Sequence, residues 1–170
     1  MIVREMAWCN QDACRQLFYL LWQHRSQAKN FRWYAPVDPI CGFLLPQLSH
    51  GYHNRHLIQG RITNIALAFH QLPLPAQWPK DLLLQIEDPL LPEQTGRWLL
   101  YAQEGYLKAQ QVHTGQSDLT LDIGALSSCW LGYRTPKQLH WQGLLQGEQE
   151  KVAQFALVFP ACFNYYYQYV

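Results

Sequence analysis

The stretch Asp118-Leu-Thr-Leu-Asp-Ile-Gly-Ala-Leu126 is the most specific piece of the sequence, because within it a strand is expected to pass directly into a helix. Residues 119–121 are expected to form a short strand. Asp122 then stands where a preferred N-cap residue is needed, so we predict a helix from this position to Leu131. Gly132 follows, and glycine in the left-handed conformation commonly ends a helix. This order of elements is typical of a mixed α/β domain.

The sequence on both sides of this stretch continues the same alternation. Before it, residues 82–87 are predicted as a strand, and residues 97–102 and 106–113 as a hairpin around Glu104-Gly105. Earlier still, residues 57–63 are predicted as a strand, with Asn64 as the cap of a short helix ending at Phe69. After it, Thr135-Pro136 begins one helix, and residues 148–159 form the last.

The N-terminal part predicts a separate strand–helix–strand. Residues 2–8 and 30–34 are the expected strands, and Asn10 or Asp12 caps the helix between them. This helix has an apolar stripe at helical spacing, formed by Ala13, Leu17, Leu20, Leu21 and His24. A polar loop over residues 46–56 marks a boundary, so we expect one domain over 1–50 and a second over 57–170.

Composition excludes several classes of protein. Of the 170 residues, 49% are hydrophobic and 15% charged, with a net charge of +1. These values exclude a disordered chain and argue against a nucleic-acid binder, which needs a basic excess. No apolar run approaches the roughly 20 residues that cross a membrane, and no signal peptide is recognised. Five scattered cysteines without a Cys-x-x-Cys pair favour reduced thiols and a cytoplasmic location.

The candidate metal and nucleophile motifs favour structural roles. His50, His53 and His56 could bind zinc if they shared a helix face, but the intervening Gly51 and Asn54 favour a loop, so we expect solvated histidines and no metal site. The serines of Ser127-Ser128-Cys129 lie in a predicted helix, where hydroxyl groups usually bond to the backbone. None of the ten glycines is followed two positions later by Gly or Ala, which excludes a Rossmann fingerprint.

Aromatic residues are the strongest compositional feature, with seven Trp, ten Tyr and seven Phe. Several fall on predicted strands and helices of one layer, where they could line an apolar pocket. The alternative is ordinary core packing, which aromatic side chains also dominate. The candidate pocket residues are Trp98, Tyr101, Leu126, Trp130, Phe155 and Phe159.

Taken in order, segments of residues 57–170 resemble the C-terminal, sterol-carrier-like domain of Eis-like (enhanced intracellular survival) GNAT N-acetyltransferases. The segments are Arg61-Ile-Thr-Asn-Ile65, Leu84-Gln-Ile-Glu-Asp88, Gly96-Arg-Trp98, Asp118 to Leu126, Trp130-Leu-Gly132 and Phe159-Pro160. Residues 3–38 are similar to the strand–helix–strand that ends the preceding acetyltransferase-like domain. The resemblance implies an α/β (α+β) fold, in which a mixed sheet with helices on one side follows an acetyltransferase-like remnant.

The resemblance also implies a function. Family members transfer the acetyl group of acetyl-CoA to an amine, and their terminal carboxylate serves as the base, a role that falls here on Val170. The Gln/Arg-x-x-Gly-x-Gly/Ala loop that holds the coenzyme diphosphate is missing. Acetyl-CoA is therefore expected only through a missing or partner domain, and the lone chain is expected to be inactive. The alternatives are a stand-alone module that binds an apolar ligand and a non-catalytic unit for interaction or self-association.

Overall fold

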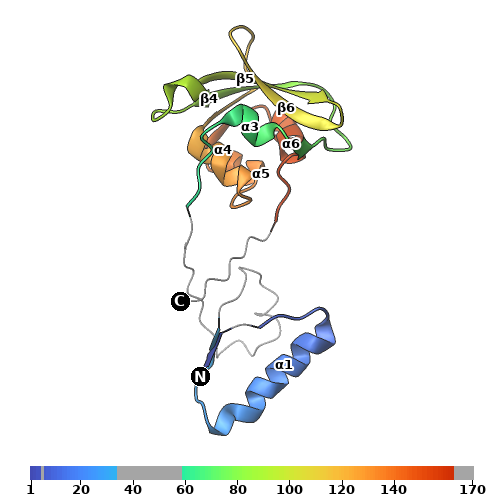
Figure 1. The fold of residues 1–170 in the computed structure, drawn as a ribbon, viewed down its shortest axis with the longest axis vertical. Helices are drawn as coiled ribbons and strands as arrows, with labels where there is room; N and C mark the ends of the chain where they lie inside the picture. Colours follow the sequence, from blue (N-terminus) through green and yellow to red (C-terminus); the bar gives the residue numbers. More distant parts are fainter. Residues whose placement is uncertain (5, 34–58, 163–170) are drawn as a thin grey trace. The chain divides into compact units, whose positions relative to one another are not determined.

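The computed structural model describes residues 1–4, 6–33 and 59–162, which fall into two compact units. One unit holds the described residues up to Trp33, and the other holds those from residue 59 onward (Figure 1). Each unit has its own secondary structure. No helix in the described ranges combines the length and the apolar run that a membrane crossing requires.

The N-terminal unit is a strand–helix–strand with parallel strands. Strand β1 (Ile2–Val3) pairs with β2 (Arg32–Trp33), and helix α1 (Gln11–Gln23) connects them, followed by the 3₁₀ turn η1 (His24–Ser26). A helical crossover is what parallel neighbours require. The predicted order is confirmed, although both strands are shorter than predicted. Asn10, one of the two expected caps, accepts a hydrogen bond from the Ala13 N–H at 2.8 Å.

The second unit contains a six-stranded mixed sheet in the order β3-β6-β5-β4-β7-β8. Strands β4 and β7 run parallel, and every other pairing in this sheet is antiparallel. The strands are β3 (Leu72–Pro73), β4 (Leu82–Glu87), β5 (Gly96–Gln103), β6 (Tyr106–Val112), β7 (Leu119–Asp122) and β8 (Leu145–Gly147).

Four helices cover one side of this sheet (Figure 1). They are α3 (Ile65–Phe69), α4 (Ile123–Trp130), α5 (Pro136–Trp141) and α6 (Gln149–Ala156), and the short 3₁₀ helix η2 (Pro92–Gln94) lies between β4 and β5. A mixed sheet with helices on one side confirms the expected α/β fold class.

The junction between β7 and α4 forms as its sequence predicts. Asp122 ends the strand and caps the helix, with its Oδ1 accepting a hydrogen bond from the Ala125 N–H at 2.7 Å. Leu119 and Leu121 are buried on the strand, and Leu126 is fully buried on the helix. Gly132 then adopts φ +69°, the left-handed conformation expected after the helix end.

Some predicted boundaries are wrong, and two strands are missed. Residues 59–63, the described part of the strand predicted over 57–63, form no strand. Strands β3 and β8 were not predicted, because two or three residues are too short to show a periodic pattern. Each exists because it pairs with a longer neighbour, β6 or β7.

The carboxylate of Asp118 ties α6 to the sheet just before β7. Its Oδ1 lies 2.7 Å from Lys151 Nζ, and its Oδ2 accepts a hydrogen bond from the Leu83 N–H at 2.9 Å. Burial raises the pKa of Asp118. The Leu83 hydrogen bond and the Lys151 ammonium together lower this pKa by more than burial raises it. The net result is a carboxyl group that is more acidic in the folded chain than in the unfolded one.

This shift predicts a pH-dependent contribution to stability. A lowered folded-state pKa stabilises the fold above the unfolded-state value of about 3.9 and loses this effect as the pH falls through the folded-state pKa. We expect Asp118→Asn to cost about 1 kcal/mol at pH 7, as for a hydrogen-bonded ion pair, and progressively less as the pH falls below about 4 toward pH 2. Thermal melts of both proteins across this range measure the difference. The exposed Asp81→Asn serves as the control, and a constant difference down to pH 2 would contradict the assignment.

Candidate functional site

The predicted catalytic carboxylate of Val170 lies outside the described residues. The same is true of His50, His53 and His56. In the parts of the chain that the structure describes, no group of three or more His, Cys, Asp or Glu side chains is placed to hold a metal ion.

Four of the six predicted pocket residues pack in the core of the second unit. Trp98, Leu126, Phe155 and Phe159 are all buried members of one apolar cluster. The Phe155 and Phe159 rings meet edge to face, with centroids 5.2 Å apart, and the Trp98 Nε1–H donates to the Gln94 carbonyl at 2.9 Å. Tyr101 is partly exposed on β5. Trp130, at the end of α4, is 44% exposed.

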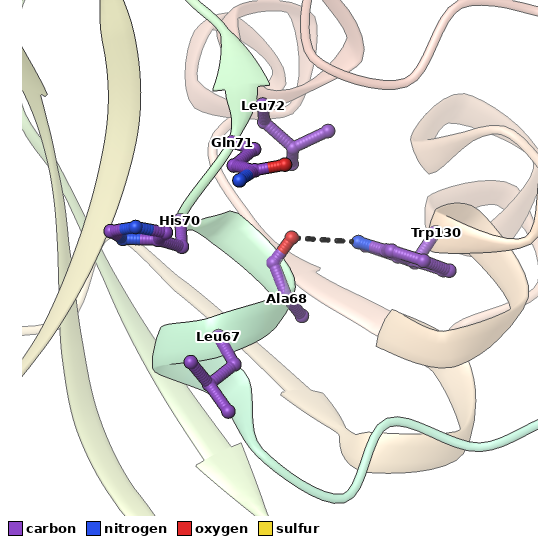
Figure 2. Close-up of a pocket in the computed structure, with 6 residues that line it drawn as sticks. All are labelled: Leu67, Ala68, His70, Gln71, Leu72 and Trp130. Carbon is purple, nitrogen blue, oxygen red and sulfur yellow. Dashed lines mark hydrogen bonds between the residues drawn. The ribbon is translucent and has the colours of Figure 1, made fainter.

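A surface hollow of about 360 Å³ lies beside Trp130 (Figure 2). The other lining residues come from α3 and the turn into β3: Leu67, Ala68, His70, Gln71 and Leu72. The Trp130 Nε1–H donates to the Ala68 carbonyl at 3.0 Å, which fixes the indole ring against α3. The hollow therefore has one immobilised aromatic wall and two leucine side chains.

His70, one of the polar residues that line the hollow, contacts Lys108. Lys108 Nζ donates to the His70 carbonyl at 2.6 Å and lies 3.3 Å from His70 Nδ1. Because an ammonium group can only donate, this contact requires Nδ1 to be the acceptor. The imidazole points away from Trp130 in Figure 2. This arrangement can hold an apolar group but contains no acid–base pair.

The residues of α3 and its following turn had not been predicted as pocket residues. Leu67 is the residue that points to the hollow once the structure is known, because it is 70% exposed while its neighbours Ile65 and Phe69 are buried. A large apolar side chain on the outer face of a five-residue helix has no packing role there. In the sequence alone, however, such a short helix does not show which face is buried.

A second hollow, of about 330 Å³, lies at the start of α4. Arg61 lines it and forms an ion pair with Asp88, whose carboxylate also accepts hydrogen bonds from the Leu90 and Leu91 N–H groups. Burial raises the pKa of Asp88. Arg61 and these hydrogen bonds lower it by more than burial raises it, so the carboxylate stays ionised. The positive charge of Arg61 is thus neutralised and does not define an anion site.

The residues Ser127, Ser128 and Cys129 have structural roles. Ser127 Oγ donates to the Ile123 carbonyl at 2.6 Å and accepts from the Ile62 N–H at 3.0 Å, and Ser128 Oγ donates to the Ala125 carbonyl at 2.8 Å. The expectation that these hydroxyl groups bond to the backbone is confirmed. Burial raises the pKa of Cys129 to about 12, so its thiol is protonated at neutral pH and is not a nucleophile.

The N-terminus of α1 is capped by Asn10. The Asn10 side chain accepts the Ala13 N–H, and the Asn10 carbonyl accepts the Cys14 N–H at 3.1 Å. Asp12 places a carboxylate in the first turn. A helix start with these features is stabilised without any bound anion.

Comparisons with known proteins match both parts of the chain. A sterol carrier protein domain model matches residues 65–166, and an acetyltransferase (GNAT) domain model matches residues 1–62. No curated protein sequence matches the chain. The combination of a GNAT-like part with a sterol-carrier-like domain agrees with the resemblance seen in the sequence.

Three of the similar solved structures match nearly the whole chain. A GCN5-related N-acetyltransferase from Anabaena variabilis ATCC 29413 has a TM-score of 0.71 at 25% identity and covers 93% of this chain. A probable N-acyltransferase from Enterococcus faecalis V583 has a TM-score of 0.75 at 21% identity, covering 97%. A GCN5-related N-acetyltransferase from Kribbella flavida has a TM-score of 0.66 at 20% identity, covering 99%.

This chain spans only 40% of the length of the Anabaena structure and 43% of each of the other two. The two structures below 25% identity show a shared fold. The sterol carrier protein domain model, in contrast, matches more than half of the residues in the sequence itself. The chain therefore belongs to the sterol carrier protein domain family.

Proposed function

We propose that the chain is the C-terminal region of an Eis-like N-acetyltransferase and takes part in acetyl transfer from acetyl-CoA to an amine. The supporting observation is the joint presence of a parallel β1–α1–β2 unit and a carrier-type mixed sheet in one chain. The match to the Anabaena N-acetyltransferase structure covers 93% of this chain and 40% of that protein. We propose domains over 1–50 and 57–170, and a cytoplasmic location based on the scattered cysteines.

The start of α1 does not fit the diphosphate of acetyl-CoA. Such a site needs free backbone N–H groups and glycines that let the ligand approach. Here the Asn10 side chain occupies the Ala13 N–H, residues 9–12 include no glycine, and Asp12 would repel the phosphates. We therefore propose that a missing or partner domain supplies the coenzyme site and that this chain alone is inactive.

The α-carboxylate of Val170 is our proposed contribution to the chemistry. A carboxylate can accept the proton of an attacking amine when partial burial raises its pKa toward the working pH. In the proposed complex it would do so in the active site of the acetyl-CoA-binding chain. The acceptor is an amine, as in aminoglycosides or lysine side chains.

Acetyl transfer assays test this proposal. We expect the purified chain to release no CoA thiol from acetyl-CoA with kanamycin or lysine as acceptor, and to show no acetyl-CoA binding by calorimetry. A complex captured from the native host should contain a chain with Gln/Arg-x-x-Gly-x-Gly/Ala and acetylate the amine. Acetylation by the lone chain would refute its incompleteness. A complex without such a chain would refute the acetyltransferase assignment.

The hollow beside Trp130 favours a second function, the binding of an apolar ligand by residues 57–170. Its immobilised indole and its leucine side chains offer apolar contact within the size range of small-molecule sites. We expect the uncharged probe N-phenyl-1-naphthylamine to bind saturably. Trp130→Ala should weaken this binding about fivefold, the effect of losing roughly 1 kcal/mol of aromatic contact.

Trp141→Ala provides the matched control for the probe measurement. Trp141 is 87% exposed and does not line the hollow. We expect its removal to leave probe binding unchanged. Equal effects of both substitutions, or no saturable binding to the unmodified chain, would eliminate the hollow as a ligand site.

A further inference from the structure

The hollow beside Trp130 has a positive charge at its rim. Its apolar walls are the fixed indole of Trp130 and the side chains of Leu67 and Leu72. His70 lines the hollow on the side away from Trp130 (Figure 2), and there Lys108 Nζ lies 2.6 Å from the His70 carbonyl oxygen and 3.3 Å from His70 Nδ1. A ligand group that contacts His70 is therefore close to an ammonium group.

The charge of Lys108 is not neutralised by a carboxylate. Its ammonium group contacts a carbonyl oxygen, an imidazole nitrogen and, at 5.3 Å from the ring centroid, the face of Tyr106. Within the described part of the chain, Lys108 forms no ion pair, and the residues that line the hollow include no Asp or Glu. Two other cations of this unit, Lys151 and Arg61, each pair with an aspartate. An anion at this rim would therefore meet a positive charge without displacing a carboxylate.

We propose that the hollow binds a small aromatic acid, with its rings against Trp130 and the leucines and its acidic group beside Lys108. This inference rests on the proposed ligand-binding function of the hollow and adds the chemical class of the ligand. An ammonium group has three N–H donors. Two of them are directed at His70, which leaves one for the acid. Because Lys108 is already held by these contacts, it loses little side-chain freedom when the acid binds.

The size of the hollow favours rigid rings over a flexible chain. Its volume of about 360 Å³ lies near the lower end of the range for small-molecule sites. The limited contact area has to offset the conformational entropy that the ligand loses, and a ring system has fewer rotatable bonds to immobilise than an alkyl chain of similar carbon number. The fixed indole of Trp130 also offers a partner for ring–ring contact. We therefore expect a flat ligand of one or two rings.

Two fluorescent probes with the same ring skeleton test the acidic group. 8-Anilino-1-naphthalenesulfonate differs from N-phenyl-1-naphthylamine by a single sulfonate. Titrations of the full chain at low salt give the ratio of the two affinities. We expect Lys108→Met to lower this ratio, sulfonate over neutral probe, about fivefold, the upper end of the strength of a solvent-exposed ion pair. Lys108→Arg keeps the charge and should keep most of the ratio, and about 0.5 M NaCl should reduce it by screening.

Two further variants locate the effect. Lys137→Met removes an exposed lysine of α5 that does not line the hollow, and it should leave the affinity ratio unchanged. Trp130→Ala should weaken both probes by a similar factor, because both use the indole wall. A ratio that responds equally to Lys108→Met and Lys137→Met would show only a general effect of net charge and would overturn the inference.

The possible failures are distinguishable. Saturable binding of the neutral probe, with an affinity ratio that does not respond to Lys108→Met, would overturn the acidic ligand and leave the hollow as an apolar site. No saturable binding of either probe would eliminate the hollow itself.

Displacement of the bound sulfonate probe tests the aromatic body of the ligand. 1-Naphthoate and decanoate carry the same carboxylate on a rigid and on a flexible body of similar carbon number. We expect 1-naphthoate to displace the probe at the lower concentration, and stronger displacement by decanoate would overturn the aromatic assignment.

Discussion

Phe155→Ala is expected to lower the free energy of unfolding of the second unit by about 3–5 kcal/mol. Phe155 is fully buried on α6, and its ring meets Phe159 edge to face at 5.2 Å. Phe159 in turn meets Phe69 of α3 at 6.1 Å. Removing the central ring leaves a cavity between the helices and the sheet. Hydrogen exchange of the β4 amides in the full chain measures the loss, because these amides exchange when the core opens.

Leu157→Ala is the matched control for this experiment. Leu157 lies one residue beyond the end of α6 and is 39% exposed. We expect its loss to cost less than about 1 kcal/mol, since little apolar area leaves a buried environment. Comparable protection losses in both variants would show that Phe155 is not central to the core.

Gly147→Ala is expected to cost about 3–5 kcal/mol, the sum of backbone strain and overpacking. Gly147 ends β8 with φ +145°, a conformation that side chains rarely adopt. A Cβ atom there would lie 2.5 Å from the Asp118 carbonyl oxygen and would also overlap the Leu119 side chain. Because Leu119 pairs with Gly147 across β7 and β8, the neighbouring backbone cannot withdraw without breaking the ladder.

Gly143→Ala separates the two causes. Gly143 also has a positive φ, of +74°, but a Cβ atom there would have no neighbour within 4 Å. It should cost about 1–2 kcal/mol, the left-handed penalty alone. Thermal melts of both variants followed by near-ultraviolet circular dichroism give the comparison. Equal losses would show that the close approach of β8 to Asp118 is absent in solution.

Local signals placed most elements of the second unit. The strand predicted over 82–87 is β4 residue for residue. Glu104 and Gly105 both have positive φ, as the tight turn between β5 and β6 requires. Asn64 caps its helix as predicted, and Thr135, where a helix is predicted to begin, forms a capping box with Gln138. Each of these features depends on residues within about four positions of one another, so the sequence carries the information directly.

The candidate site depended on contacts that local patterns do not contain. Trp98, Phe155 and Phe159 were predicted to line a pocket, and the structure places them in the apolar core. An inward-facing ring has the same sequence pattern whether it meets an empty space or another ring. The hollow beside Trp130 arises because α3, 62 residues away, supplies the Ala68 carbonyl that fixes the indole.

The fold class, the caps and turns, and the family resemblance can be read from residue types at short spacing. Four features emerge only in the folded chain: the sheet order, the two short strands β3 and β8, the ion pair of Asp118 with Lys151, and the exposure of individual tryptophans. These features arise from pairing and burial between segments far apart in the chain. A residue's exposure is fixed by what packs against it, and neighbouring residues in the sequence do not specify that partner.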